Sequence, residues 1–228
     1  AENSSTLTLS RSSDSKYWNG TNWQSDLVNL SVSHAQAGPG ATATWTLNVS
    51  LPQWLEDDYA IQVTSNDTVN NTSSQRISFF IDSEAPSVVG DLRDGSGDSD
   101  YNYTVSDSSY SGSWSPANDS RSGLSLYQYA LGTSAGGTNV KDWTDNGLAT
   151  TVTIDGLALT DGTTYYFSVR AVDAVGNVSS VQTSNGITVD SVRPTALLTS
   201  HSQDARYGRG HMPMTVTGSV ADNAAGQG

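Results

Sequence analysis

Residues 160–177 carry the pattern that most restricts how this chain can fold. Tyr165, Phe167, Val169 and Ala171 occupy every second position, so an extended chain places them on one face. The dipeptides Asp-Gly before this run and Gly-Asn after it are typical turn formers. Alternation between two turns predicts a half-buried β-strand whose aromatic and aliphatic side chains face a core.

The same stretch has the spacing of a tyrosine corner. Leu159, Gly162 and Tyr165 are placed as in β-sandwiches where a tyrosine hydroxyl bonds to the backbone a few residues upstream. Residues 55–67 repeat the design, with Tyr59 at the start of a second alternating run. The two stretches predict two sandwich domains, one around each tyrosine.

Composition favours strands over helices and excludes several partners. Ser, Thr, Gly, Asn and Asp are abundant, and no stretch keeps an apolar stripe of helical period over three turns. The chain has 23 acidic and 10 basic residues, a net charge of −13, which argues against nucleic acid and anionic membrane surfaces. No apolar run is long enough for membrane insertion. Because there is no cysteine, disulfides and thiolate metal sites are excluded.

Two similar segments divide the chain. Residues 82–86 (DSEAP) and 190–194 (DSVRP) share an Asp-Ser start and a proline that ends one sheet and begins the next. They delimit the segments 1–82, 83–190 and 191–228. The strands expected in the first two are 6–11, 27–32, 43–51, the Tyr59 run and 76–81, then 111–114, 126–131, 142–143, 151–155, the Tyr165 run and 186–190. Repeats at domain length indicate tandem modules.

The second segment resembles a prokaryotic fibronectin type III domain. The residues that carry the resemblance, over 84–190, are Trp114, the Asp119-x-x-Ser-Gly turn, 127–133, Trp143 and 159–177. Residues 1–82 resemble the Ig-like modules of large bacterial surface adhesins, through 17–23 (YWNGTNW) and 55–59, with Asp58 where such modules usually have glycine. The resemblance implies an all-β fold of tandem Ig-like and fibronectin type III β-sandwiches.

The Ig-like resemblance also implies that one domain is split between the two ends of the chain. In that pattern the strand before residues 17–23 is the third, so two opening strands are missing from 1–82. Residues 195–198 and 214–220 have the pattern of those two strands. We therefore expect residues 191–228 to complete the 1–82 domain of a neighbouring copy. Separate subunits could exchange strands, or one long chain could repeat; folding back within one chain is a third option.

Acidic and amide side chains in the turns suggest a calcium site at each domain junction. Sandwich topology places Asp119, Asp173 and Asn177 near the linker residues Asp82 and Glu84. The counterparts at the next junction are Asp190 and Asp222 of one copy with Asp67 and Asn71 of the next. Hard oxygen ligands in such numbers suit Ca²⁺. The alternative is that these side chains stabilise Asx-turns. The acidic loop 94–100 is expected to be a solvated turn.

No catalytic constellation is visible in the sequence. The three histidines stand apart, and neither a Gly-x-Ser-x-Gly elbow nor a phosphate loop occurs. Trp18, Trp23, Trp45 and Trp54 raise the possibility of stacking on carbohydrate, but Trp45 has core register and the others flank turns where packing is the simpler interpretation. The sequence therefore predicts a protein that is not an enzyme.

The predicted function is structural: one repeat of a secreted or cell-surface fibre or stalk, built from end-to-end β-sandwiches and partnered by other copies of itself. The alternative is an adhesin or a carbohydrate-binding accessory module of a secreted protein, with surface glycans as partners. Ten Asn-x-Ser/Thr sequons fit a glycosylated extracellular surface, although Asn- and Ser-rich turns would produce them too.

Overall fold

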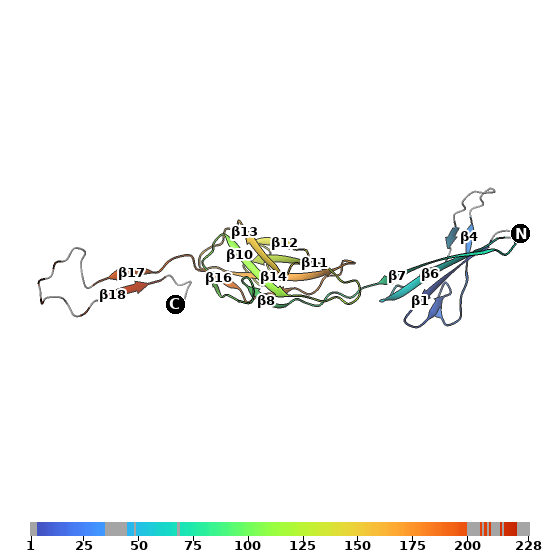
Figure 1. Cartoon of the computed structure of the whole chain (residues 1–228), viewed down its shortest axis with the longest axis horizontal. Helices are drawn as coiled ribbons and strands as arrows, with labels where there is room; N and C mark the ends of the chain where they lie inside the picture. Colours follow the sequence, from blue (N-terminus) through green and yellow to red (C-terminus); the bar gives the residue numbers. More distant parts are fainter. Residues whose placement is uncertain are drawn as a thin grey trace. The chain divides into compact units, whose positions relative to one another are not determined.

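The computed structural model describes residues 4–34, 45–47, 49–67, 69–199, 206, 208, 210, 215 and 217–222, except for the side chains of Ser33, His34 and Trp45. The described residues form strands and turns, and none of them lies in a helix that could span a membrane. The chain divides into two compact units, 1–84 and 85–228 (Figure 1). The predicted all-β fold is confirmed.

The first unit is a sheet organised around its first strand. Its strands are β1 (Ser4–Arg11), β2 (Lys16–Trp18), β3 (Trp23–Gln24), β4 (Leu30–His34), β5 (Trp45–Leu47), β6 (Asp57–Asn66) and β7 (Thr72–Ile81). All pairings are antiparallel: β6 lies between β1 and β7, while β2 and β4 pair with different parts of β1. The ten-residue pairing of β6 with β7 is the longest.

The core of the first unit lies on one side of β1. Leu7 and Leu9 are almost fully buried, together with Trp18, Leu30 and Val32. The alternation of leucine with serine and threonine along β1 puts these apolar side chains on one face, as the period of a strand requires. Side chains of β2, β3, β4 and β5, with Trp54 from the loop before β6, pack against these leucines.

The second unit contains a complete two-sheet sandwich. Its strands are β8 (Gly90–Asp94), β9 (Tyr103–Thr104), β10 (Ser109–Ser115), β11 (Leu124–Gly132), β12 (Lys141–Asp145), β13 (Thr151–Asp155), β14 (Thr164–Asp173), β15 (Gln182–Thr183) and β16 (Ile187–Val189). One sheet has the order β13-β10-β8, and the other β12-β11-β14-β16-β9, with β15 also on β14. β12 pairs with β11 and not with β13, so the edge strand belongs to the larger sheet.

Aromatic side chains join the two sheets. Phe167 of β14 is fully buried, with ring centroids of Tyr110 at 5.0 Å and Trp114 at 5.9 Å, both from β10. Gly112 lies between those two on β10, and a Cβ there would come within 2.7 Å of the Phe167 ring. The glycine therefore allows β10 to approach β14 closely enough for its aromatic neighbours to pack.

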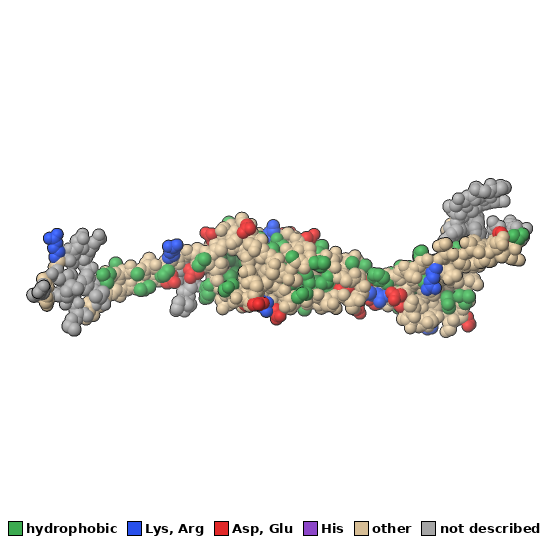
Figure 2. Space-filling model, in the orientation of Figure 1, with side chains coloured by type: hydrophobic (Ala, Val, Ile, Leu, Met, Phe, Trp, Pro, Cys, Tyr) green, Lys and Arg blue, Asp and Glu red, His purple; other side chains and the backbone are tan. Residues whose placement is uncertain are grey.

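A separate two-stranded hairpin follows the second linker. β17 (Thr195–Leu198) pairs antiparallel with β18 (Gly218–Ala221), and every residue of both strands is exposed. Figure 2 shows hydrophobic side chains on the surface of this hairpin. The expected strand at 195–198 is thus present. Of the other expected strand, 214–220, only the part from Gly218 lies in β18; Thr215 and Thr217 are described but not in a strand, and Met214 and Val216 lie outside the described residues.

One expectation about a turn needs correction, and one departure from the resemblance is explained. Asp94, predicted to belong to a solvated loop, is the last residue of β8 and is 0% exposed, because β10 and the turn before β16 enclose it. Asp58, at the position where the Ig-like modules that residues 1–82 resemble usually have glycine, lies inside β6, and its φ is not among the positive values that would favour glycine. An ordinary strand residue therefore fits there.

Candidate functional site

Each unit contains a tyrosine corner, as predicted. The hydroxyl of Tyr165 accepts the backbone N–H of Thr160 at 2.8 Å. The hydroxyl of Tyr59 both donates to the carbonyl of Leu55 and accepts its N–H, each at 3.1 Å. Both tyrosines are buried, so these bonds satisfy a polar group that would otherwise be costly to bury. The corner fixes the turn that leads into β6 and β14.

The turns that leave β6 and β14 are also the same. Asp173 and Asn177 lie 106 positions after Asp67 and Asn71, the same offset as between the two tyrosines. In both turns the Asn side chain donates to Oδ2 of the Asp at 2.7 Å, and the Asn backbone N–H donates to Oδ1 at 2.8 Å. Strand, corner and turn therefore recur as one structural unit.

Asp173 is held as a carboxylate by its turn. Its side chain is 2% exposed, and Oδ1 also accepts the N–H groups of Val175 and Gly176 at 3.0 and 2.7 Å. Burial alone would raise the pKa of Asp173, but the hydrogen bonds from Asn177 and the turn amides outweigh it and lower this pKa. At Asp67 the bonds from Asn71 are the main cause of a lowered pKa.

Asp119 lies beside Asp173 in the second unit. An oxygen of each carboxylate lies within 4.8 Å of the other. Oδ1 of Asp119 accepts the N–H groups of Arg121 and Gly123 at 3.1 and 2.7 Å, and the carbonyl of Gly123 accepts the N–H of Ala174. Both aspartates thus close Asx-turns, which is the alternative considered above. Two converging carboxylates are also the start of a hard cation site, and calcium there stays a prediction.

The other predicted ligands have separate surroundings. Asp82, in the first unit, accepts the N–H of Glu84 at 3.2 Å. One carboxylate oxygen of Asp190 is buried with no hydrogen-bond partner among the described residues. Asp222 is exposed after β18. Within the described residues, Asp67, Glu84, Asp190 and Asp222 belong to no group of three side chains close enough to share a metal ion.

The structure reveals a repeated contact at the linkers that the sequence analysis missed. Ser83 donates from its N–H and its hydroxyl to Oε2 of Glu56, at 2.8 and 2.9 Å. Ser191 donates in the same way to Oδ1 of Asp161, at 2.7 and 3.0 Å. Each serine follows the Asp of a linker, and each acid precedes a corner tyrosine. We call these contacts the exit clamps, because each holds the chain where it leaves a unit.

The sequence held a signal for the exit clamps. The Asp-Ser start is common to both linkers, and an acid lies three or four residues before each corner tyrosine. What was missing is the fold, since the two halves of each clamp are 27 and 30 positions apart. Their approach follows from the pairing of the corner strand with the last strand of the unit.

Asp94 forms a buried polar cluster with Tyr110. The Tyr110 hydroxyl donates to Oδ1 of Asp94, and the N–H of Gly186 donates to Oδ2 at 3.0 Å. Burial raises the pKa of Asp94, and the hydrogen bonds from Tyr110, Ser184 and Gly186 offset part of this. Burial also raises the pKa of Tyr110 well above its usual value. The cluster ties β8 and β10 to the other sheet.

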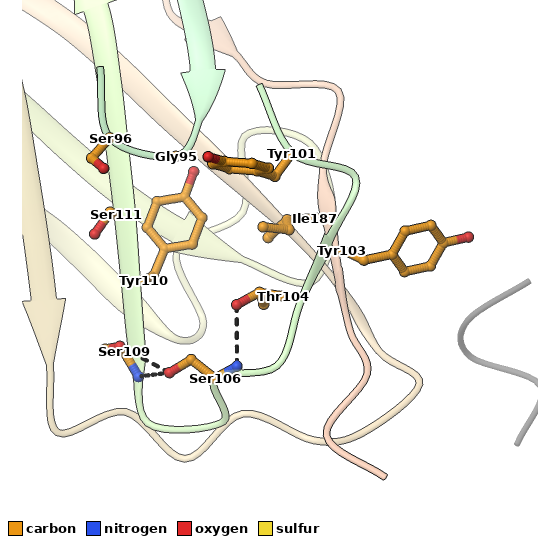
Figure 3. A pocket seen from close by; sticks show the side chains of 10 residues that line it. All are labelled: Gly95, Ser96, Tyr101, Tyr103, Thr104, Ser106, Ser109, Tyr110, Ser111 and Ile187. Atoms are coloured by element: carbon orange, nitrogen blue, oxygen red, sulfur yellow. Dashed lines mark hydrogen bonds between the residues drawn. The ribbon is translucent and has the colours of Figure 1, made fainter. Parts of the chain in front are cut away.

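A pocket of about 210 Å³ lies next to this cluster (Figure 3). Tyr101 and Tyr103 at its rim are about half exposed, and Tyr103 points outward. Gly95 has φ +146°, and a Cβ there would meet the Tyr101 ring at 2.5 Å, so the glycine lets this ring lie against the loop. The lining is otherwise mostly hydroxyl-bearing and contains no charged side chain.

The tryptophans predicted to pack do so where the structure describes them. Trp18 is buried, lies 5.4 Å from Trp23 between ring centroids, and donates its indole N–H to the carbonyl of Ser50 at 2.8 Å. Trp54 packs edge-on against Tyr59 at 4.9 Å. The side chain of Trp45 lies outside the described residues. The described tryptophans of the first unit thus form no exposed aromatic platform.

Comparison with known proteins yields a structural likeness only. No family model and no curated protein matches the chain. Among solved structures, the crystal structure of the FN1–FN3 domains of chicken CNTN1 is similar, with 14% identity and a TM-score of 0.40. The alignment covers 83% of this chain and 57% of that one, so this chain spans little more than half of that structure. The sandwich fold described above rests on strand pairing and burial.

Proposed function

We propose that this protein is a non-catalytic structural module of an extracellular or cell-surface fibre or stalk, in which β-sandwiches follow one another end to end. The observation that carries the proposal is the repeated exit clamp. Ser83 with Glu56 and Ser191 with Asp161 secure the chain in the same way at the end of two successive modules. A device repeated at each module exit suits a protein that transmits load along its chain.

The remaining repeated features support the same function. Corner, strand and Asp–Asn turn recur at a constant offset, and both linkers are short and contain proline, which restricts backbone motion. The acidic net charge of −13 favours solubility and discourages lateral aggregation. The partner in this proposal is a further copy of the same module, joined through residues 191–228 and 1–82.

Force spectroscopy tests the load-bearing role. In this experiment the chain is pulled from its two ends. We expect Glu56→Ala to lower the unfolding force of the first unit only, and Asp161→Ala to lower the unfolding force of the second unit only. Each substitution removes two solvent-exposed hydrogen bonds to a carboxylate, about 0.5–1 kcal/mol for each bond after screening by water. Asp98→Ala, at an exposed acid in the 94–100 loop, is the control. Unchanged forces in both clamp variants would count against the proposal.

Imaging gives an independent check. A strand of about ten residues at about 3.4 Å per residue spans about 35 Å, so one period of two sandwiches with linkers should advance about 80 Å. Electron micrographs of assembled protein should show rods with that axial repeat. Compact, unordered aggregates would contradict an end-to-end arrangement.

The pocket beside Tyr101 favours a second candidate function, adhesion to glycans. The half-exposed tyrosine rings could stack on the apolar faces of neutral sugars. The uncharged, hydroxyl-bearing side chains of the pocket could form hydrogen bonds with the sugar hydroxyl groups. Binding to a glycan array should be lost in Tyr101→Ala and Tyr103→Ala and kept in Val105→Ala, an exposed neighbour. Binding that survives both tyrosine substitutions would exclude this pocket as the glycan site.

A further inference from the structure

The first unit exposes apolar surface on a face that is buried elsewhere in the same sheet. Leu9, Ile61 and Ile77 are paired across β1, β6 and β7, so they lie on one face. Leu9 is 2% exposed, Ile61 is half-buried, and Ile77 is 63% exposed. The side chains that bury Leu9 therefore do not extend over Ile77 on β7. A groove of about 360 Å³, lined by Ile61, Val63, Ser65, Ser73, Gln75 and Ile77, marks the uncovered area.

The second unit has its counterpart of this face completely covered. Phe167 and Val169 lie 106 positions after Ile61 and Val63, on the strand that follows the same tyrosine corner. Both are 0% exposed, because β10 packs across them and β8 pairs with β10. The difference between the units is thus the pair of strands that opens the second sandwich.

The hairpin β17–β18 resembles that opening pair. Both pairs are antiparallel, and both follow a linker that begins Asp-Ser and contains proline. In the sequence, both pairs are followed by an Asp with a Gly four residues later, at 119–123 and at 222–226, although residues 223–226 lie outside the described residues. Yet β17 and β18 cover no other strand among the described residues, and Leu197, Leu198 and Val220 are all more than half exposed.

We propose that β17–β18 of one copy docks on the β6–β7 face of a second copy and completes its sandwich. The inference rests on the proposed function, since it names the joint between successive modules. The occupant is a second copy because an opening pair builds the module that follows its linker, as β8 and β10 do after residues 82–86. β7 pairs only with β6 among the described strands, whereas its counterpart β16 also pairs with β9, so the edge of β7 is a second incomplete feature of the first unit.

Charge is compatible with this joint. Two copies of net charge −13 repel one another, so a joint between them needs uncharged surfaces. The six side chains that line the groove are neutral, and so are the eight residues of β17 and β18. Apolar burial is then the driving force, opposed by no buried charge.

Two single-defect variants test the joint with the full chain. Ile77→Asp places a charge on the β6–β7 face and does not change the hairpin. Val220→Asp places a charge on the hairpin and does not change the β6–β7 face. Both residues are mostly exposed, so the units should keep their fold, which circular dichroism checks. Val105→Asp, at an equally exposed valine of the second unit, is the matched control.

Mass photometry of each protein and of an equimolar mixture reads out assembly. We expect wild type and Val105→Asp to form a ladder of oligomers, and each defect variant alone to stay monomeric, with association weakened at least about tenfold. The mixture should form dimers and stop there, because it contains one intact face and one intact hairpin. With single cysteines at 77 and 220 on otherwise cysteine-free copies, mixing in the presence of an added thiol oxidant such as diamide should give the mixed disulfide, with the diamide reduced to its hydrazine.

Three results would overturn the inference. If both defect variants assemble like wild type, the joint lies elsewhere, while the structural function keeps its own test by force. If the mixture forms no dimer, face and hairpin do not meet. If wild type stays monomeric and Ile77→Cys is protected from thiol reagents, another segment covers the face, and no second copy is needed.

Discussion

The turn at Asp173 offers a sharp test of how the sandwich is stabilised. This aspartate closes the turn after β14 by accepting four hydrogen bonds, three from backbone N–H groups and one from the side chain of Asn177. With 2% exposure, water cannot replace the lost acceptor without opening the turn. Asp173→Ala should therefore leave several amides unpaired.

Asp173→Ala should lower the free energy of unfolding by about 3 kcal/mol, because hydrogen bonds to a charged acceptor contribute about 1.5–3 kcal/mol each and their contributions are not additive. For a sandwich of this size, that lowers Tm by about 12–15 °C. Asp173→Asn keeps an oxygen for the amides but turns an NH₂ group toward Asn177, so about half of the loss should remain. Differential scanning calorimetry of the full chain measures both.

The contribution of Asp173 depends on pH in a defined direction. Its pKa in the folded state is lowered, so its stabilisation is fully present above the unfolded pKa of about 3.9 and is lost as the pH falls through the folded pKa. The Tm difference between wild type and Asp173→Ala should be constant from pH 8 to about pH 5. It should shrink below about pH 4.

Asp67→Ala is the matched control, because Asp67 has the same bonds with Asn71 but lies in the first unit and is more exposed. It should shift a different calorimetric transition, and by less. A Tm decrease below about 3 °C in Asp173→Ala, or a decrease that grows on acidification, would refute the account of this turn.

Three further predictions follow from the second unit. Gly112→Ala places a Cβ against the Phe167 ring and should lower the free energy of unfolding, measured with urea, by about 1–3 kcal/mol. An unchanged free energy of unfolding would mean that the two sheets can move apart easily. Tyr165→Phe removes one corner bond and should cost about 1 kcal/mol, with no change in the first unit; a loss shared by both units would argue against separate cores. Calcium should raise the Tm of the second unit, a chelator should reverse the increase, and Asp119→Asn should abolish the increase. An equal Tm with and without chelator would mean that Asp119 stabilises its turn and binds no calcium.

Burial of polar groups was the main limit of sequence-based prediction here. The loop 94–100 is Gly-, Ser- and Asp-rich, which is typical of solvated turns, yet Asp94 lies inside the sandwich, bonded to Tyr110 and Gly186. Gly186 is 92 positions away, so no local pattern could indicate that contact. The exit clamps, although exposed, were missed because their partners are 27 and 30 positions apart in the sequence.

The sequence by itself determined the strands, the corners and the Asp–Asn turns, because side-chain alternation and bonds between residues four or five apart are local properties of the chain. The tyrosine spacing predicted two corners, and both formed. Only the tertiary structure decided what covers each face. Phe167 and Ile61 occupy equivalent positions, yet one is enclosed by β10 and the other borders an open groove, since burial depends on strands that arrive from far away in the chain.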